Sequence, residues 1–82
     1  MDSATILRQL NDILCDVFDD PDLVVTQATA AADVPGWDSM NHITIVVATE
    51  RHFGIKIRTA DIERLRNVGE FVSLIGARLS GG

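Results

Sequence analysis

The sequence has few of the residues that build disulfides, metal sites and membrane spans. It contains one cysteine, Cys15, and two histidines, His42 and His52, among 82 residues. A single thiol cannot form an internal disulfide and offers no metal-ligand spacing. No apolar run approaches the ~20 residues of a membrane-spanning helix, and the start of the chain lacks the basic and long apolar stretches of a signal peptide. These absences predict a soluble protein in the reducing cytoplasm.

Positive charge is also scarce, and it is unevenly placed. Residues 1–38 contain eight acidic side chains against Arg8 alone, a net charge of −7, whereas residues 39–82 carry four acidic and six basic side chains, a net charge of +2. An overall charge of −5 argues against nucleic acid, whose phosphates need a basic footprint. We therefore expect protein partners, and the chain itself is expected to be a monomer.

The chain is short for an enzyme. Its 82 residues, 46% of them apolar, suffice for one folded domain with a modest core. They leave little room for an enclosed active site. The sequence predicts a single domain over residues 1–82, with no catalytic residues, no metal and a flexible tail at about residues 80–82.

Three segments repeat apolar residues at the spacing of one helical face. They are residues 3–18, 40–53 and 68–79. A short helix is expected over residues 59–65, after an extended connector. Residues 19–37 hold two prolines and a glycine without a sustained period, which predicts a long loop with one helical turn near residues 27–32. The predicted fold is all-α: a small antiparallel four-helix bundle, three helices longer and one short, with a long loop between helices one and two.

Polar residues and glycine mark the ends of these helices. Ser3 is placed to cap the first helix, and either Asp38 or Ser39 is placed to cap the second. Gly54 can adopt the left-handed conformation that ends a helix. Asn67, with a glutamate three residues later, resembles a capping box at the start of the last helix.

The second helix carries more apolar surface than one buried face needs. Its apolar residues spread over roughly two thirds of the circumference, against the ~100° stripe of an ordinary surface helix. One edge of this stripe, Met40 and Val47, lies on the side of Ser39. Two interpretations stay open: neighbouring helices wrap this helix more fully, or the edge contacts a partner or a flexible ligand. Glu50 falls inside the stripe and is expected to reach solvent.

The segment GWDSM, residues 36–40, places the hydroxyl of Ser39 where a loop meets a helix. A phosphate ester on that hydroxyl would lie beside unpaired backbone N–H groups and the positive end of the helix dipole. A serine in this place suits modification by another enzyme. The alternative is that Ser39 or Asp38 only caps the helix.

From GWDSMNHITIVVATERHFGIKI through the short helix to NVGEFVSLI, the chain resembles the acyl carrier protein family. The resemblance implies that Ser39 is esterified with 4'-phosphopantetheine, taken from coenzyme A by a separate magnesium-dependent transferase, and that the thiol of this arm carries acyl groups as thioesters. It makes Asp38 the acidic neighbour of the attachment site. It implies partner-binding roles for four residues: Met40, Val47, Glu50 and Glu63. The expected partners are the phosphopantetheinyl transferase and acyl-activating, condensing or acyltransferase enzymes.

The second helix also departs from the family pattern. Fatty-acid carriers usually hold acidic residues at four positions where this chain has Asn41, Thr44, Arg51 and His52. Steering toward the basic patches of general fatty-acid enzymes should therefore be weak. This favours a specialised fatty-acid, polyketide or related pathway over general fatty-acid synthesis. Peptidyl carriers usually have Gly-Gly-x-Ser at this point, which GWDS does not match.

Single features of the sequence suggest other functions. Ser39 and His42 lie one turn apart beside Asp38, but the G-x-S-x-G setting of a hydrolase is absent. The terminal Gly81-Gly82 occurs in ubiquitin-like tails, whose β-grasp fold conflicts with the helical period near the N-terminus. An unmodified helical adaptor that binds proteins stays open as an alternative.

Overall fold

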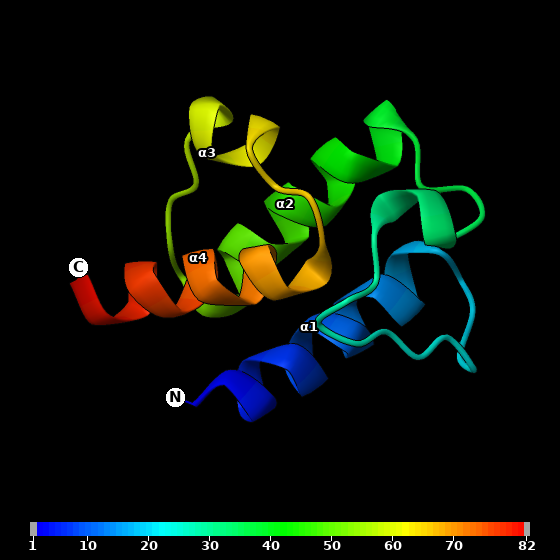
Figure 1. Cartoon of the computed structure of the whole chain (residues 1–82), viewed down its shortest axis with the longest axis horizontal. Helices are drawn as coiled ribbons and strands as arrows, with labels where there is room; N and C mark the ends of the chain where they lie inside the picture. Colours follow the sequence, from blue (N-terminus) through cyan, green and yellow to red (C-terminus); the bar gives the residue numbers. More distant parts are fainter. Residues whose placement is uncertain (1, 82) are drawn as a thin grey trace.

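The computed structural model describes residues 2–81, and these form four α-helices and one 3-10 turn, with no strand among them (Figure 1). The elements are α1 Ser3–Val17, η1 Ala31–Asp33, α2 Ser39–Phe53, α3 Thr59–Glu63 and α4 Val68–Gly81. The all-α, four-helix prediction is confirmed. Within residues 2–81, no helix has the length and apolarity needed to cross a membrane. The tail predicted at about residues 80–82 overlaps α4, and Gly82 lies outside the described residues.

The core is the shared apolar interior of three helices, and α1 packs against both α2 and α4. Figure 1 shows α1 along one side of the molecule and the short α3 on the opposite side. Each long helix contributes apolar residues at helical spacing. The most buried apolar side chains of these helices are Ile6, Leu10 and Leu14 of α1, Ile45 and Val46 of α2, and Val68, Phe71, Val72 and Ile75 of α4. Val25 and Val34 are also buried, so the long loop between α1 and α2 is anchored to the core.

Helix α1 is bounded by signals in its own sequence. Its cap is Asp2 and not Ser3, because Asp2 has extended backbone and its carboxylate accepts a hydrogen bond of 2.8 Å from the Thr5 N–H. Hydrogen bonds from Thr5, from its side chain and then its backbone, lower the pKa of the Asp2 carboxyl. At the other end Asp19 adopts a left-handed φ of 52°, and the N–H groups of Asp19 and Asp20 bind carbonyls of the last turn. This is a Schellman stop with aspartate where glycine is usual.

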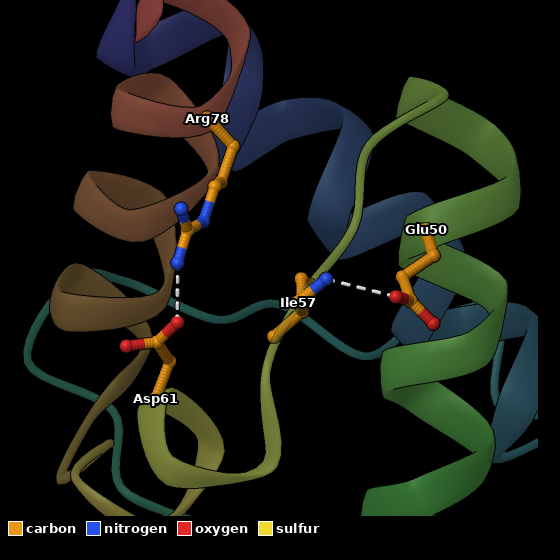
Figure 2. Close-up of polar contacts among 4 residues, drawn as sticks. All are labelled: Glu50, Ile57, Asp61 and Arg78. Carbon is orange, nitrogen blue, oxygen red and sulfur yellow. Dashed lines mark hydrogen bonds and ion pairs between the residues drawn. The ribbon is translucent and has the colours of Figure 1, made fainter. Parts of the chain in front are cut away.

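Helix α3 is held by side chains from other helices (Figure 2). It has five residues, and its N-cap makes no side-chain hydrogen bond. Glu50 of α2 accepts a hydrogen bond of 2.8 Å from the N–H of Ile57 in the connector, and Arg78 of α4 forms an ion pair with Asp61 of α3. Because a helix this short is unstable alone, these tertiary contacts decide where α3 lies.

Candidate functional site

Ser39 is the first residue of α2, and its side chain is exposed. The cap of this helix is Asp38, whose carboxylate accepts a hydrogen bond of 2.9 Å from the Asn41 N–H. Of the two residues placed to cap α2, Asp38 therefore does so. Within the described residues the Ser39 hydroxyl makes no hydrogen bond that would occupy it. The helix can begin without the Ser39 hydroxyl, which leaves that oxygen free for chemistry.

The surroundings of this hydroxyl suit a phosphate ester. The N–H groups of Ser39 and Met40 belong to the first turn of α2, where no intrahelical carbonyl can accept from them. They point toward the helix start, together with the positive end of the helix dipole. A phosphate on Ser39 Oγ would meet both donors and the dipole. The residues present at this site therefore fit a phosphorylated group attached at Ser39.

The loop that leads into Ser39 is tied to the first turn of α2 by two side chains. Gly36 turns the chain with a φ of 87°, and its carbonyl accepts a hydrogen bond of 2.6 Å from the Asn41 side-chain amide. The indole Nε1–H of Trp37 donates to Nδ1 of His42 at 3.1 Å. The Trp37 ring also packs beside Phe18, with 6.0 Å between ring centroids. Sequence reasoning did not find these ties, although Asn41 and His42 are one helical turn beyond the loop.

An apolar edge of α2 is left uncovered next to Ser39. Met40 is 79% exposed, Ile43 64% and Val47 46%. The three residues lie at helical spacing, so they form one strip, which we call the apolar edge. The first interpretation, that neighbouring helices wrap this helix fully, does not hold for the described residues, because their helices leave this strip exposed. Ile43 was missing from the predicted partner positions, although its spacing between Met40 and Val47 could have identified it.

The two predicted acidic positions differ in their surroundings. Glu50 lies near the end of α2, is half-buried, and binds the N–H of Ile57 through one carboxylate oxygen (Figure 2). The Glu50 side chain was expected to reach solvent, and it is only partly exposed. Glu63 is the last residue of α3 and is exposed. The structure brings Ser39, Asp38 and the apolar edge together, whereas Glu50 and Glu63 lie farther along the chain at α2 and α3.

The arrangement does not resemble a hydrolase or a metal centre. The hydrogen bond found for the His42 ring goes to Trp37, not to Ser39. Among the residues described, no three histidine, cysteine or acidic side chains could together hold a metal ion. Cys15 lies on α1 and is half-buried, and its thiol donates a hydrogen bond to the backbone carbonyl of Leu23. The site presents an exposed hydroxyl at the start of a helix.

Comparison with known proteins identifies the family. A family model described as the phosphopantetheine attachment site matches residues 8–75. The acyl carrier protein of Phenylobacterium zucineum is 32% identical over 77 residues, which cover 93% of this chain and 96% of that protein. The acyl carrier protein of Thermotoga maritima is 30% identical over 74 residues, 90% of this chain and 91% of that protein.

The fold agrees with a solved relative. The solution NMR structure of the holo acyl carrier protein from Geobacter metallireducens matches with a TM-score of 0.87 at 36% identity, over 93% of this chain and 87% of that chain. The chain belongs to the acyl carrier protein family. It is a carrier with covalently attached phosphopantetheine and not a catalyst. The adaptor and β-grasp alternatives are thereby set aside.

Proposed function

We propose that Ser39 carries the 4'-phosphopantetheine arm, and that the chain is a monomeric, cytoplasmic carrier for a specialised fatty-acid, polyketide or related acyl pathway. The observation that supports Ser39 is its free, exposed hydroxyl at the start of a helix that Asp38 caps. An acyl group held on such an arm is delivered to successive enzymes at a raised effective concentration.

The chain's own part in the attachment is small and well defined. The transferase takes the proton of the Ser39 hydroxyl, whose oxygen then forms the bond to phosphorus while coenzyme A loses its nucleotide portion. The first-turn N–H groups and the helix dipole stabilise the negative charge of the product. We propose that Met40 and Val47, with Ile43 between them, give the transferase and the later enzymes an apolar contact. Glu50 and Glu63 supply acidic contacts on α2 and α3.

The attachment site is tested by intact mass after incubation with coenzyme A, magnesium and a broad-specificity phosphopantetheinyl transferase. The wild type should gain one phosphopantetheine, and Ser39→Ala should gain none. The matched control is Ser73→Ala, an exposed serine on α4, which should be modified like the wild type. Ser39→Ala should keep its helicity, because the cap of α2 is Asp38. Modification of Ser39→Ala would contradict the proposed site.

The proposal of a dedicated pathway rests on charge. Thr44, Arg51 and His52 are exposed on α2, where family members usually have acidic residues. The connector, α3 and the turn after it add four exposed basic side chains: Lys56, Arg58, Arg64 and Arg66. Partner enzymes with basic docking patches should therefore associate slowly with this surface, since surface charge acts mainly on the association rate and on the choice of partner.

This charge argument can be tested with a general fatty-acid ketosynthase. We expect Thr44→Glu with Arg51→Glu to raise turnover of the acylated carrier roughly threefold to thirtyfold at low salt. The gain should shrink above 0.1 M salt, where the Debye length is ~10 Å. Asn41 is left unchanged, because its amide holds the Gly36 carbonyl.

The control places the same charge change on other helices, as Ser73→Glu with Arg8→Glu, two exposed positions on α4 and α1. It should leave turnover close to that of the wild type. A wild type that already matches a general fatty-acid carrier, or a double variant without effect at low salt, would remove the support for a dedicated pathway. The family assignment would stand in either case.

A further inference from the structure

A pocket lined by three basic side chains lies between the end of α2, the connector to α3 and the last turn of α4. Its volume is about 480 Å³, which falls within the roughly 300–1,000 Å³ of small-molecule sites. Lys56 and Arg58 line it from the connector, and Arg78 lines it from α4. Among the described residues that line it, none is acidic. We call it the basic pocket.

The other walls of the basic pocket are largely apolar. Phe53, the last residue of α2, and Ile55 line it and also pack against the core. Leu79 of α4 lines it too and is 36% exposed. Water beside these side chains is unfavourable, and a hydrocarbon chain would displace it. Apolar walls next to three positive charges therefore match a ligand with a negatively charged head and an apolar chain.

The positive charges of the basic pocket are not neutralised within the described part of the chain. Lys56 and Arg58 are exposed, and they form no ion pair with any described residue. The ion pair of Arg78 with Asp61 uses Nη2, and the buried Nε of Arg78 has no acceptor among the described residues. Three like charges around one pocket repel one another. A guanidinium has five donors in a planar fork that matches a carboxylate, so a carboxylate can bind here and leave Asp61 in place.

We propose that the basic pocket binds a free aliphatic carboxylate. Its head group lies between the connector and Arg78, and its hydrocarbon chain lies along Phe53 and Leu79. Ser39 is at the opposite end of the 15-residue helix α2 from this pocket, which separates the two by about 20 Å. The proposal goes beyond the carrier function and does not depend on Ser39.

A bound carboxylate should stabilise α3. Arg58 is the N-cap residue of α3, and its carbonyl accepts a hydrogen bond of 3.1 Å from the Ile62 N–H in that helix. A head group shared by Arg58 and Arg78 would add a second link between the start of α3 and α4, beside the ion pair of Arg78 with Asp61 (Figure 2). Because opening of α3 would disrupt the pocket, a ligand that binds only the closed form slows the opening.

The site is tested by NMR titration of the unmodified protein with sodium octanoate. The largest shifts should fall on the amides of the connector and of Arg78 and Leu79. Octanol, which lacks the charge, and acetate, which lacks the long chain, should each bind at least roughly tenfold more weakly. Octanol or acetate binding as tightly as octanoate would overturn the proposal. Shifts centred on the apolar edge of α2 would overturn it as well.

Charge recognition is tested with two matched double variants. Lys56→Gln with Arg58→Gln removes two of the three positive charges and should weaken octanoate binding roughly tenfold or more. Arg78 is left unchanged because it also holds Asp61. The control, Arg64→Gln with Arg66→Gln, removes the same charge from two exposed positions outside the basic pocket and should bind like the wild type. An equal loss in both variants would show a general attraction to basic surface and would overturn the site.

The effect on α3 is measured by hydrogen exchange of the Ile62 amide. With octanoate at ten times its Kd, exchange should become roughly tenfold slower in the wild type, and no more than about twofold slower in the Lys56→Gln, Arg58→Gln variant at the same concentration. Binding without slower exchange would overturn the stabilisation of α3. All of these measurements use protein without phosphopantetheine, so their failure leaves the proposed function intact, and a failure of attachment at Ser39 leaves the basic pocket intact.

Discussion

Helices α1 and α3 owe their structure to different parts of the molecule. Helix α1 has 15 residues, a capping carboxylate before it and a Schellman stop after it, all within about four residues of its ends. Helix α3 has five residues and depends on Arg78 from α4 and on Glu50 from α2 through the connector (Figure 2). The comparison teaches that one side of this domain is specified locally and the other only by the assembled fold.

The proposed contact surface includes the less self-sufficient helix, α3. The apolar edge belongs to α2, and Glu63 belongs to α3, whereas α1 provides the packing support. Elements with few local contacts open at lower free energy than the core. A carrier that meets several enzymes can adjust α3 without unfolding α1. Three substitutions test this comparison, in order of decreasing effect.

The largest effect is expected in α1. Leu14 is fully buried between the long helices, and Leu14→Ala should lower the free energy of unfolding by about 2–5 kcal/mol. All helices should unfold in one transition in denaturant, monitored by circular dichroism. The control is Leu79→Ala on α4, where the side chain is 36% exposed, and it should cost less than about 1 kcal/mol. Separate melting of α1 would contradict a shared core.

A smaller and more local effect is expected for α3. Arg78→Met keeps much of the side-chain stem but removes the ion pair with Asp61. The side chains of Arg78 and Asp61 are each about a third exposed. The free energy of unfolding should fall by about 1 kcal/mol or less. Hydrogen exchange of the Ile62 and Arg64 amides should become roughly twofold to fivefold faster, because α3 opens by itself.

The control for this experiment is Arg8→Met on α1, an exposed position, which should leave the α3 amides unchanged. If Arg78→Met speeds exchange equally in α1 and α3, then α3 opens only by global unfolding. The contrast between the two helices would then be wrong.

The smallest effect is a gain in stability at the end of α1. Asp19 holds a left-handed φ of 52° and adds negative charge at the helix C-terminus. Asp19→Gly should raise the free energy of unfolding by about 0.5–1 kcal/mol, since glycine adopts this conformation without strain and the charge is lost. Asp12→Gly, inside the same helix, should lower it by a few tenths of a kcal/mol. A loss of stability in Asp19→Gly would show that the aspartate side chain contributes a contact of its own.

The sequence by itself determined the three long helices and the place of Ser39, the proposed attachment site, in the chain. Apolar spacing located the three long helices, Gly54 ended α2 with a φ of 67°, and Asn67 capped α4 through the Glu70 N–H. These signals act between residues at most four apart, so they can be found without knowing the fold. The same short-range signals placed Ser39 at the start of a helix, and the resemblance to carrier proteins depends on this position of Ser39.

Only the tertiary structure decided which side chains remain exposed and which form contacts with other segments. Glu50 turned out to bind the connector seven residues away, Asp61 to pair with Arg78 seventeen residues away, and Ile43 to stay uncovered. The Trp37–His42 bond also depends on how the loop returns to α2. Side-chain periodicity gives the direction in which a residue points along its own helix, but a contact between segments is set by how the whole chain packs, and local spacing does not encode that.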